Sequence, residues 1–136
     1  MDTHFETPSG FEPQRDPGVD TRAHLVVERE VIGANVGANG YTTVSQADEL
    51  SRLLRLRRED RLLDIGAGGG WPGLYLAEKS GCEATLLDIS DADLRRSVQR
   101  AAGANVYSRC SFFRGTATAL PFRPRSFEAL VHTDVL

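Results

Sequence analysis

The chain has 136 residues, of which 40% are hydrophobic and 26% are charged, and these values are typical of one soluble domain. Its formal net charge of -3 comes without a basic stripe, which argues against a nucleic-acid partner. The sequence contains no apolar run close to the ~20 residues of a transmembrane helix and no signal-peptide core at its start, so we expect a cytoplasmic protein that does not contact a membrane.

The chain has two cysteines, Cys82 and Cys110. Two are too few for a disulfide framework, and they lack the spacing of metal ligands. We therefore expect both to be small buried hydrophobic residues in a reducing compartment, and we expect no metal site.

Residues 1–20 contain three prolines and few apolar side chains, which predicts a flexible N-terminal arm. An alternative is that Phe5 or Phe11 folds over a ligand site. Residues 21–60 are expected to form an N-terminal helical segment, beginning with a short helix over residues 21–32.

A glycine-rich loop, GANVGANGYTT, follows this first helix. Its Tyr41 is either a core aromatic residue or a lid residue over a ligand. A second helix is predicted from Thr43, whose side chain can cap the first turn while Gln46 completes a capping box. Four apolar residues of this helix share one face: Val44, Ala47, Leu50 and Leu54.

The stretch RLLDIGAGGGWPGLYLA, residues 61–77, has the order strand, glycine turn and helix. Glycines gather where the backbone needs a positive φ or approaches another group closely, because they have no Cβ. The second strand is predicted over residues 84–87, ending in Asp88, since an unalternating apolar run suits a strand covered on both faces.

A helix follows, with Ser90 as its capping residue and Gly103 at its end. Third and fourth strands are predicted around residues 110–113 and 127–131. Alternation of strands and helices with short connections predicts right-handed crossovers and an α/β fold with a parallel sheet.

The glycine spacing alone leaves two ligand classes open. Gly68, Gly70 and Gly73 fit the G-x-G-x-x-G pattern of dinucleotide sites, and Asp88 lies 20 residues beyond the first of them. A pyrophosphate needs free amides at the start of the helix, where this chain has bulky Trp71 and then a proline without N–H. A ligand without phosphates loses nothing by this arrangement.

Three blocks of the sequence resemble the class I S-adenosylmethionine-dependent methyltransferases. LLDIGAGGG places Asp64, Gly66, Gly68 and Gly70 at the fixed positions of the family's first motif. LLDIS resembles the second-strand motif, and GTATALPFRPRSFEALV resembles a later block of small-molecule methyltransferases. The resemblance covers about residues 41–136.

The resemblance implies a Rossmann-like sheet with helices on both faces and strand order 3-2-1-4, present here as the cofactor-binding half, residues 61–136. It implies S-adenosylmethionine as the cofactor, with Asp88 binding the ribose hydroxyls and Asp64 helping to hold the methionyl amino group. In relatives an aspartate that bonds the adenine amino group stands where this chain has Thr116, whose uncharged hydroxyl accepts more weakly. The candidate cofactor-binding residues are Asp64, Gly66, Ala67, Gly68, Asp88, Ile89, Thr116 and Ala117.

The resemblance also implies methyl transfer to a small-molecule acceptor, because the L-P-F block is similar to that of enzymes acting on metabolites, lipids and quinones. It assigns no catalytic residue; His132, at the end of the fourth strand, is a candidate base, a cofactor contact or simply a polar residue. The alternatives are an NAD-binding oxidoreductase domain and a non-catalytic remnant or interaction module.

The family fold continues beyond the fourth strand, where this sequence stops. We therefore expect a fragment of a longer protein in preference to a chain whose uncovered fourth strand pairs with another chain, including a second copy of itself. The 136-residue chain alone is expected to bind the cofactor weakly and to turn over poorly, because the wall that positions the acceptor is largely missing.

Overall fold

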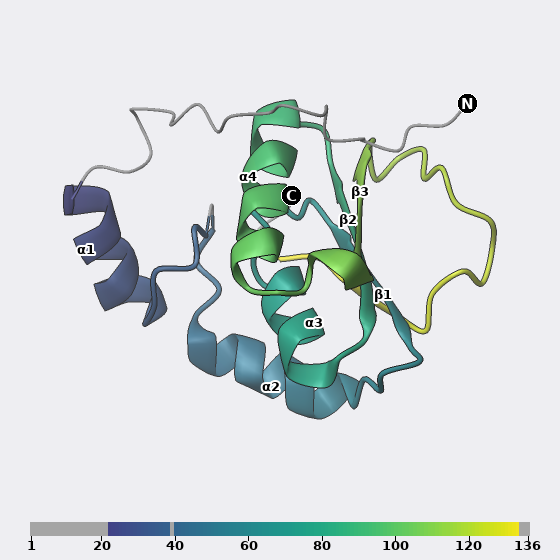
Figure 1. The fold of residues 1–136 in the computed structure, drawn as a ribbon, viewed down its shortest axis with the longest axis horizontal. Helices are drawn as coiled ribbons and strands as arrows, with labels where there is room; N and C mark the ends of the chain where they lie inside the picture. The colour runs from purple at the N-terminus through teal and green to yellow at the C-terminus, as the bar shows by residue number, and fades with distance from the viewer. Residues whose placement is uncertain (1–21, 39, 134–136) are drawn as a thin grey trace.

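The computed structural model describes residues 22–38 and 40–133, so the predicted N-terminal arm with Phe5 and Phe11 lies outside the described residues. Four parallel strands form one sheet in the order β3-β2-β1-β4, which confirms the predicted order (Figure 1). The strands are β1 (Arg61–Ile65), β2 (Glu83–Asp88), β3 (Cys110–Arg114) and β4 (Ala129–Val131). The helices are α1 (Arg22–Ile32), α2 (Val44–Leu54), α3 (Gly73–Ser80), α4 (Asp91–Gly103) and the short 3-10 helix η1 (Tyr107–Arg109).

The central strands β1 and β2 are buried along most of their length, as their continuous apolar runs predicted. In the register of the sheet, Asp64 of β1 lies between Leu86 of β2 and Val131 of β4. The strand order reverses after β1, so the end of β1 lies at the switch point where parallel α/β sheets bind ligands.

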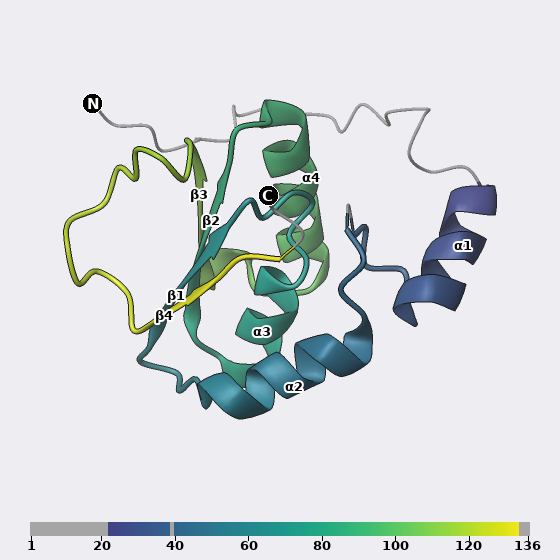
Figure 2. The same ribbon diagram turned by 180° about the vertical axis from the view of Figure 1, so that it is seen from behind.

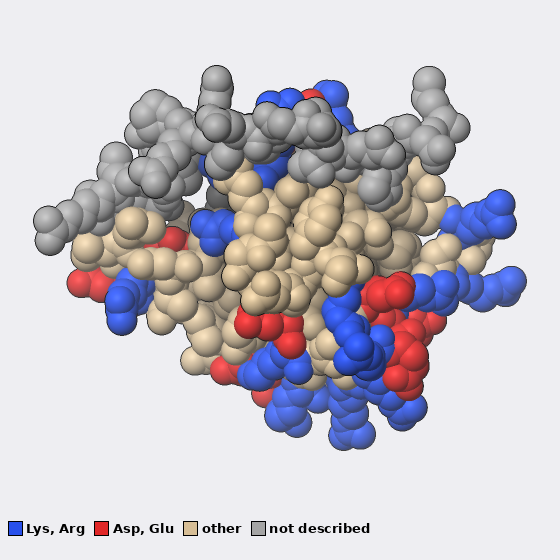
Figure 3. All heavy atoms as spheres, viewed as in Figure 1, with Lys and Arg blue, Asp and Glu red and all other residues tan. Residues whose placement is uncertain are grey.

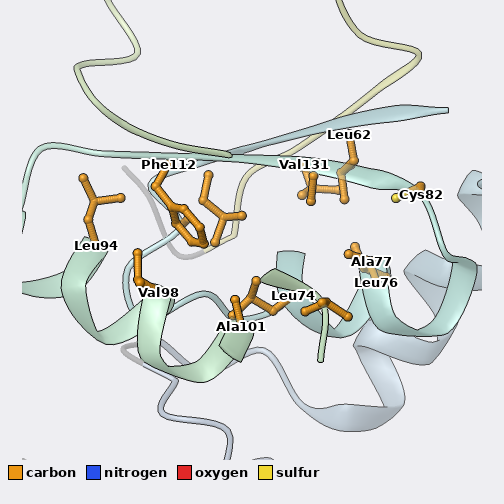
Figure 4. Close-up of a cluster of buried hydrophobic side chains, with 14 residues drawn as sticks. Leu62, Leu74, Leu76, Ala77, Cys82, Leu94, Val98, Ala101, Phe112 and Val131 are labelled. Atoms are coloured by element: carbon orange, nitrogen blue, oxygen red, sulfur yellow. The ribbon is translucent and has the colours of Figure 1, made fainter. Parts of the chain in front are cut away.

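One face of the sheet packs on α3 and α4. Figure 4 shows apolar side chains of these helices, such as Leu76 and Leu94, pointing toward Leu62 and Phe112 of the strands. Cys82 is fully buried in this cluster, as predicted. Cys110 is only partly buried and packs against the cluster, and burial raises the pKa of its thiol to about 12.

The other face of the sheet is covered by the connection between β3 and β4 (Figure 2). Phe113, Phe122 and Phe127 pack there in edge-to-face pairs, with ring centroids 5.3 and 5.0 Å apart, over Leu63 and Leu87. The sequence predicted helices on both faces, whereas among the described residues the helices that contact the sheet lie on one face.

The helix boundaries follow the predicted capping chemistry. The Thr43 hydroxyl accepts a hydrogen bond from the Gln46 amide at 3.2 Å, and the Gln46 side chain accepts one from the Thr43 amide at 2.8 Å. Ser90 caps α4 by accepting from the Asp93 amide, and α4 ends at Gly103. The predicted apolar face of α2 packs toward α3 and the core.

Charged side chains gather at the lower end of the view in Figure 3, over α2 and the turn that leads into β1. Arg61 pairs with Glu128 at 2.8 Å, and both side chains are largely exposed. Such exposed pairs contribute about 0–1 kcal/mol to the free energy of unfolding, so this ion pair adds little to stability. Across the described residues, the structure contains no helix with the length and apolar character needed to cross a membrane.

Candidate cofactor site

The turn between β1 and α3 adopts the backbone geometry that its glycines predicted. Gly66, Gly68 and Gly70 have φ values of +68°, +53° and +100°, which side chains with a Cβ rarely adopt. The amides of Gly66 and Ala67 both donate to the carbonyl oxygen of Leu87, at 2.8 and 3.0 Å. These two hydrogen bonds fix the turn against the end of β2.

Asp88 ends β2 directly beside this turn. One carboxylate oxygen accepts from the Gly68 amide and the other from the Ser90 amide, both at 2.8 Å. The side chain is half-buried, and each oxygen has a second lone pair for a further hydrogen bond. Asp88 therefore connects the glycine turn to the start of α4 and can still accept two hydroxyl donors.

Ile89 and the start of the β3–β4 connection lie around Asp88. The Gly115 amide donates to the Asp88 carbonyl at 3.0 Å, which brings Thr116 and Ala117 to the same edge of the sheet. Ile89 is 70% exposed, although it is a large apolar residue. The hydroxyl of Thr116, which is exposed, lies 3.0 Å from that of Thr118 and also accepts from the Thr118 amide.

Asp64 lies in the same turn but below its surface. Its side chain is 1% exposed and accepts a hydrogen bond from the Gly73 amide at 2.9 Å, at the start of α3. Burial raises the pKa of the Asp64 carboxyl to about 8, against the opposing effect of the Gly73 hydrogen bond. Among the described residues, the hydrogen-bond partner of Asp64 is thus a backbone amide and not the cation of a salt bridge.

The raised pKa of Asp64 predicts that stability falls with pH. The native state binds one more proton than the unfolded chain between the ordinary value of 3.8 and about 8. The contribution of Asp64 to the free energy of unfolding is complete below the unfolded-state pKa of 3.8. It is lost as the pH rises toward the native-state pKa of about 8, at up to about 1.4 kcal/mol per pH unit. Urea unfolding from pH 5 to 8 should show this slope in the native chain, and Asp64→Asn should flatten it.

The exposed Glu78→Gln change on α3 is the matched control for this prediction, because it also replaces a carboxyl by an amide. It should leave the slope unchanged. Equal slopes in the native chain and Asp64→Asn would contradict the assignment of the slope to Asp64.

The amides of the turn are largely engaged within the chain. Those of Gly68 and Gly73 donate to the side chains of Asp88 and Asp64, and that of Leu74 donates to the Gly70 carbonyl. A pyrophosphate would have to displace these bonds and approach the Asp88 carboxylate, so the geometry disfavours a dinucleotide at this turn.

A comparison with protein families agrees with this geometry. The family model described as a methyltransferase domain matches residues 62–136, which is more than half of the chain. This chain belongs to the class I S-adenosylmethionine-dependent methyltransferases. Membership in this family favours the methyltransferase interpretation of the glycine turn over the dinucleotide one.

Two curated methyltransferases show the extent of the similarity. The 27-O-demethylrifamycin SV methyltransferase of Amycolatopsis mediterranei is 36% identical over 65% of this chain. A ubiquinone/menaquinone biosynthesis C-methyltransferase of Rhizobium leguminosarum is 30% identical over 95% of it. The chain spans 32% and 51% of the lengths of these two relatives.

The fold is shared with a solved S-adenosylmethionine-dependent methyltransferase from Geobacter sulfurreducens, determined in complex with S-adenosyl-L-homocysteine. Its TM-score is 0.61 at 25% sequence identity, and the match covers 68% of this chain and 36% of that one. The α/β fold and the parallel sheet therefore agree with the family assignment.

An open cavity lies between the first turns of α2 and the segment that follows β4. It has a volume of about 420 Å³ and is lined by Tyr41, Thr42, Gln46, Glu49, Leu50 and Thr133. Tyr41 is 80% exposed, so its interpretation as a core aromatic residue is wrong. His132 is exposed and follows Val131, the partner of Asp64 in the sheet, but its role stays a prediction.

Sequence reasoning missed the contacts that the N-terminal segment makes with the methyltransferase turn. Trp71 donates from its indole Nε1 to the Thr42 carbonyl at 2.7 Å, and Glu28 is a buried carboxylate that binds the loop after α1. The sequence alone shows Trp71 only as a bulky residue at the start of the helix, where it argues against a pyrophosphate. No local sequence pattern predicts the burial of Glu28, because it lies among other charged residues of a short helix.

Proposed function

We propose that residues 61–133 form the cofactor-binding half of an S-adenosylmethionine-dependent methyltransferase that acts on a small-molecule acceptor. The observation that carries the proposal is the Asp88 carboxylate, held by the Gly68 and Ser90 amides at the end of β2 with lone pairs to spare. Vicinal ribose hydroxyls are matched donors for such a carboxylate. Because the chain spans 32% and 51% of the lengths of two relatives, methyl transfer by the whole protein is likewise a proposal.

The surrounding residues suit the other parts of this cofactor. The positive-φ glycines Gly66 and Gly68 leave the turn without Cβ atoms, so a ligand can lie close to the backbone. Exposed Ile89 offers an apolar surface for the adenine ring, and Thr116 and Ala117 offer a hydroxyl and an amide for its edge. When bound, the cofactor supplies an electrophilic methyl group on a sulfonium ion.

Asp64 fits the methionyl end of the cofactor less directly. Its carboxyl is buried against Gly73, so a contact with the amino group requires water or a local rearrangement. Its place at the end of β1, at the switch point of the sheet, supports this assignment. The role of the chain's own residues is to bind and orient, because methyl transfer depends chiefly on placing the acceptor in line.

A small-molecule acceptor is supported by the L-P-F block and by the relatives, whose names refer to demethylrifamycin and to ubiquinone or menaquinone. Association of two copies through β4 is a second proposal. It is supported by the position of β4 at the edge of the sheet and by Leu130, which is 48% exposed. Light scattering would support it through a defined dimer mass and contradict it through a monomer mass.

Binding can be mapped by titrating the ¹⁵N-labelled chain with S-adenosylhomocysteine, a method that also detects weak complexes. The largest amide shifts are expected at the turn, at the end of β2 and at the start of the β3–β4 connection: Gly66, Ala67, Gly68, Asp88, Ile89, Thr116 and Ala117. NADH at the same concentrations should shift these amides little. Equal responses to both ligands, or shifts scattered over the surface, would contradict the proposal.

A further inference from the structure

Glu28 is an acidic side chain of α1 that is only 6% exposed. One of its carboxylate oxygens accepts hydrogen bonds from the amides of Val36 and Ala38, at 2.9 and 2.8 Å. Both donors belong to the loop that follows α1. A buried carboxylate is costly unless it is hydrogen-bonded, so this loop and Glu28 stabilise each other.

The loop that Glu28 binds packs directly on the glycine turn, at Gly69 and Trp71. A Cβ added at Gly69 would lie 2.8 Å from the Gly37 carbonyl oxygen, so the two backbones are in close contact. Ala38 is buried in a cluster with Trp71, whose indole also donates to the Thr42 carbonyl. The loop thus contacts the turn at Gly69 and again two residues later.

These contacts lie next to the residues that are proposed to bind the cofactor. Gly69 follows Gly68, whose amide is held by Asp88, so a displaced loop would release one side of the turn. Glu28 itself is far from Asp88 in the sequence and lies before residues 62–136, the range that the family model matches. Its effect on the site must pass through the loop.

We propose that Glu28 is a positioning residue for the glycine turn: it folds residues 33–38 into the shape in which Gly37 and Ala38 pack on Gly69 and Trp71. Its consequence for ligand binding rests on the proposed function. When the loop is docked, the turn is held between the end of β2 on one side and the N-terminal segment on the other. When the loop is not docked, the shape of the turn that binds the ligand is less populated. The apparent affinity for the cofactor then falls in proportion to that population.

Trp71 is the single tryptophan of the chain, which makes docking of the loop directly measurable. The indole is 8% exposed, so loss of docking should shift its fluorescence emission to the red and increase quenching by acrylamide. Glu28→Ala should produce both changes. It should also raise the Kd for S-adenosylhomocysteine about tenfold if the docked fraction falls to about a tenth.

Three further variants separate positioning from general damage. Glu28→Gln keeps an acceptor oxygen at the same place and should restore most of the indole burial and of the affinity. Glu30→Ala, an exposed change on the same helix, should alter neither. Gly37→Ala should reproduce the Glu28→Ala result from the loop side, because Gly37 has a φ of +65°, a backbone conformation that alanine rarely adopts.

The outcomes are distinct. An unchanged indole environment in folded Glu28→Ala would overturn the proposal, and so would an exposed indole with unchanged affinity, since Glu28 would then be merely structural. A native chain that binds no S-adenosylhomocysteine would overturn the proposed function, and with it the link from Glu28 to ligand binding. The fluorescence comparison would still decide whether Glu28 docks the loop.

Discussion

Replacing Gly70 with alanine is expected to destabilise the fold by about 2–5 kcal/mol, from backbone strain of ~1–2 kcal/mol and overpacking of ~1–3 kcal/mol. Gly70 has a φ of +100°, a conformation that side chains with a Cβ rarely adopt. The added Cβ would lie 2.4 Å from Leu74 Cδ1 and 3.2 Å from Ser97 Cβ. Leu74 and Ser97 are both buried, so neither has free space to move into.

Urea unfolding of the purified chain measures this effect. The midpoint should fall strongly in Gly70→Ala while the slope m stays the same, because the surface exposed on unfolding does not change. Since small domains are stable by only about 5–15 kcal/mol, a loss of this size removes a large share of the free energy of unfolding.

Gly103→Ala is the matched control for Gly70→Ala. Gly103 is the last residue of α4, and a Cβ there meets no atom within 4 Å. The change should be neutral or stabilising by up to about 1 kcal/mol, because alanine favours the helix more than glycine does. Similar midpoints for the two variants would show that the geometry of the turn at Gly70 is not required.

The features that the sequence predicted correctly are those encoded within a few neighbouring residues. The capping box of Thr43 and Gln46 is a local exchange of two hydrogen bonds. The position of Asp88 follows from an apolar run that ends in an acid before a capping serine. The glycine turn follows from composition alone, and the order of the strands follows from the family resemblance.

The features that the sequence did not predict depend on contacts between distant segments. Trp71 and Thr42 are 29 residues apart, and no periodicity connects them. Asp64 has its hydrogen-bond partner because the turn brings Gly73 beside it. Glu28 is buried because the loop after α1 folds over it. Pattern reasoning gives which residues are polar, but it does not give which polar residues are buried.

The face of the sheet opposite α3 and α4 shows the same limit. The sequence identifies the L-P-F block only by its resemblance to the family and does not predict that Phe122 packs on the sheet. In the structure Phe122 lies between Phe113 and Phe127 and covers β1 and β2. Tertiary packing gives this motif a stabilising role in addition to its position beside Thr116 and Ala117.

Asp88→Ala is expected to weaken binding of S-adenosylhomocysteine by about 10–100-fold. Hydrogen bonds to a charged group contribute ~1.5–3 kcal/mol, and 1.4 kcal/mol corresponds to a tenfold change in Kd. The change also leaves the amides of Gly68 and Ser90 without the acceptors that they have in the structure. Calorimetric or NMR titration gives the ratio of the Kd values.

The structural part of this loss can be separated from the ligand part. Asp88→Asn keeps one acceptor oxygen for a backbone amide and should unfold closer to the native chain than Asp88→Ala does. Glu83→Ala removes a carboxylate from the opposite end of the same strand, at an exposed position, and should bind normally. An Asp88→Ala chain with normal affinity would remove Asp88 from the site.

A ligand without the two ribose hydroxyls completes the test. The 2′,3′-dideoxy analogue of S-adenosylhomocysteine should bind the native chain more weakly than the parent ligand, because the spare lone pairs of Asp88 then have no donors. In Asp88→Ala the two ligands should bind almost equally, since the carboxylate that distinguishes them is gone. One Kd ratio divided by the other, converted to a free energy as RT ln, gives the coupling energy of Asp88 with the hydroxyls. A coupling near zero would mean that Asp88 only supports the turn and the start of α4, and that the ribose lies elsewhere.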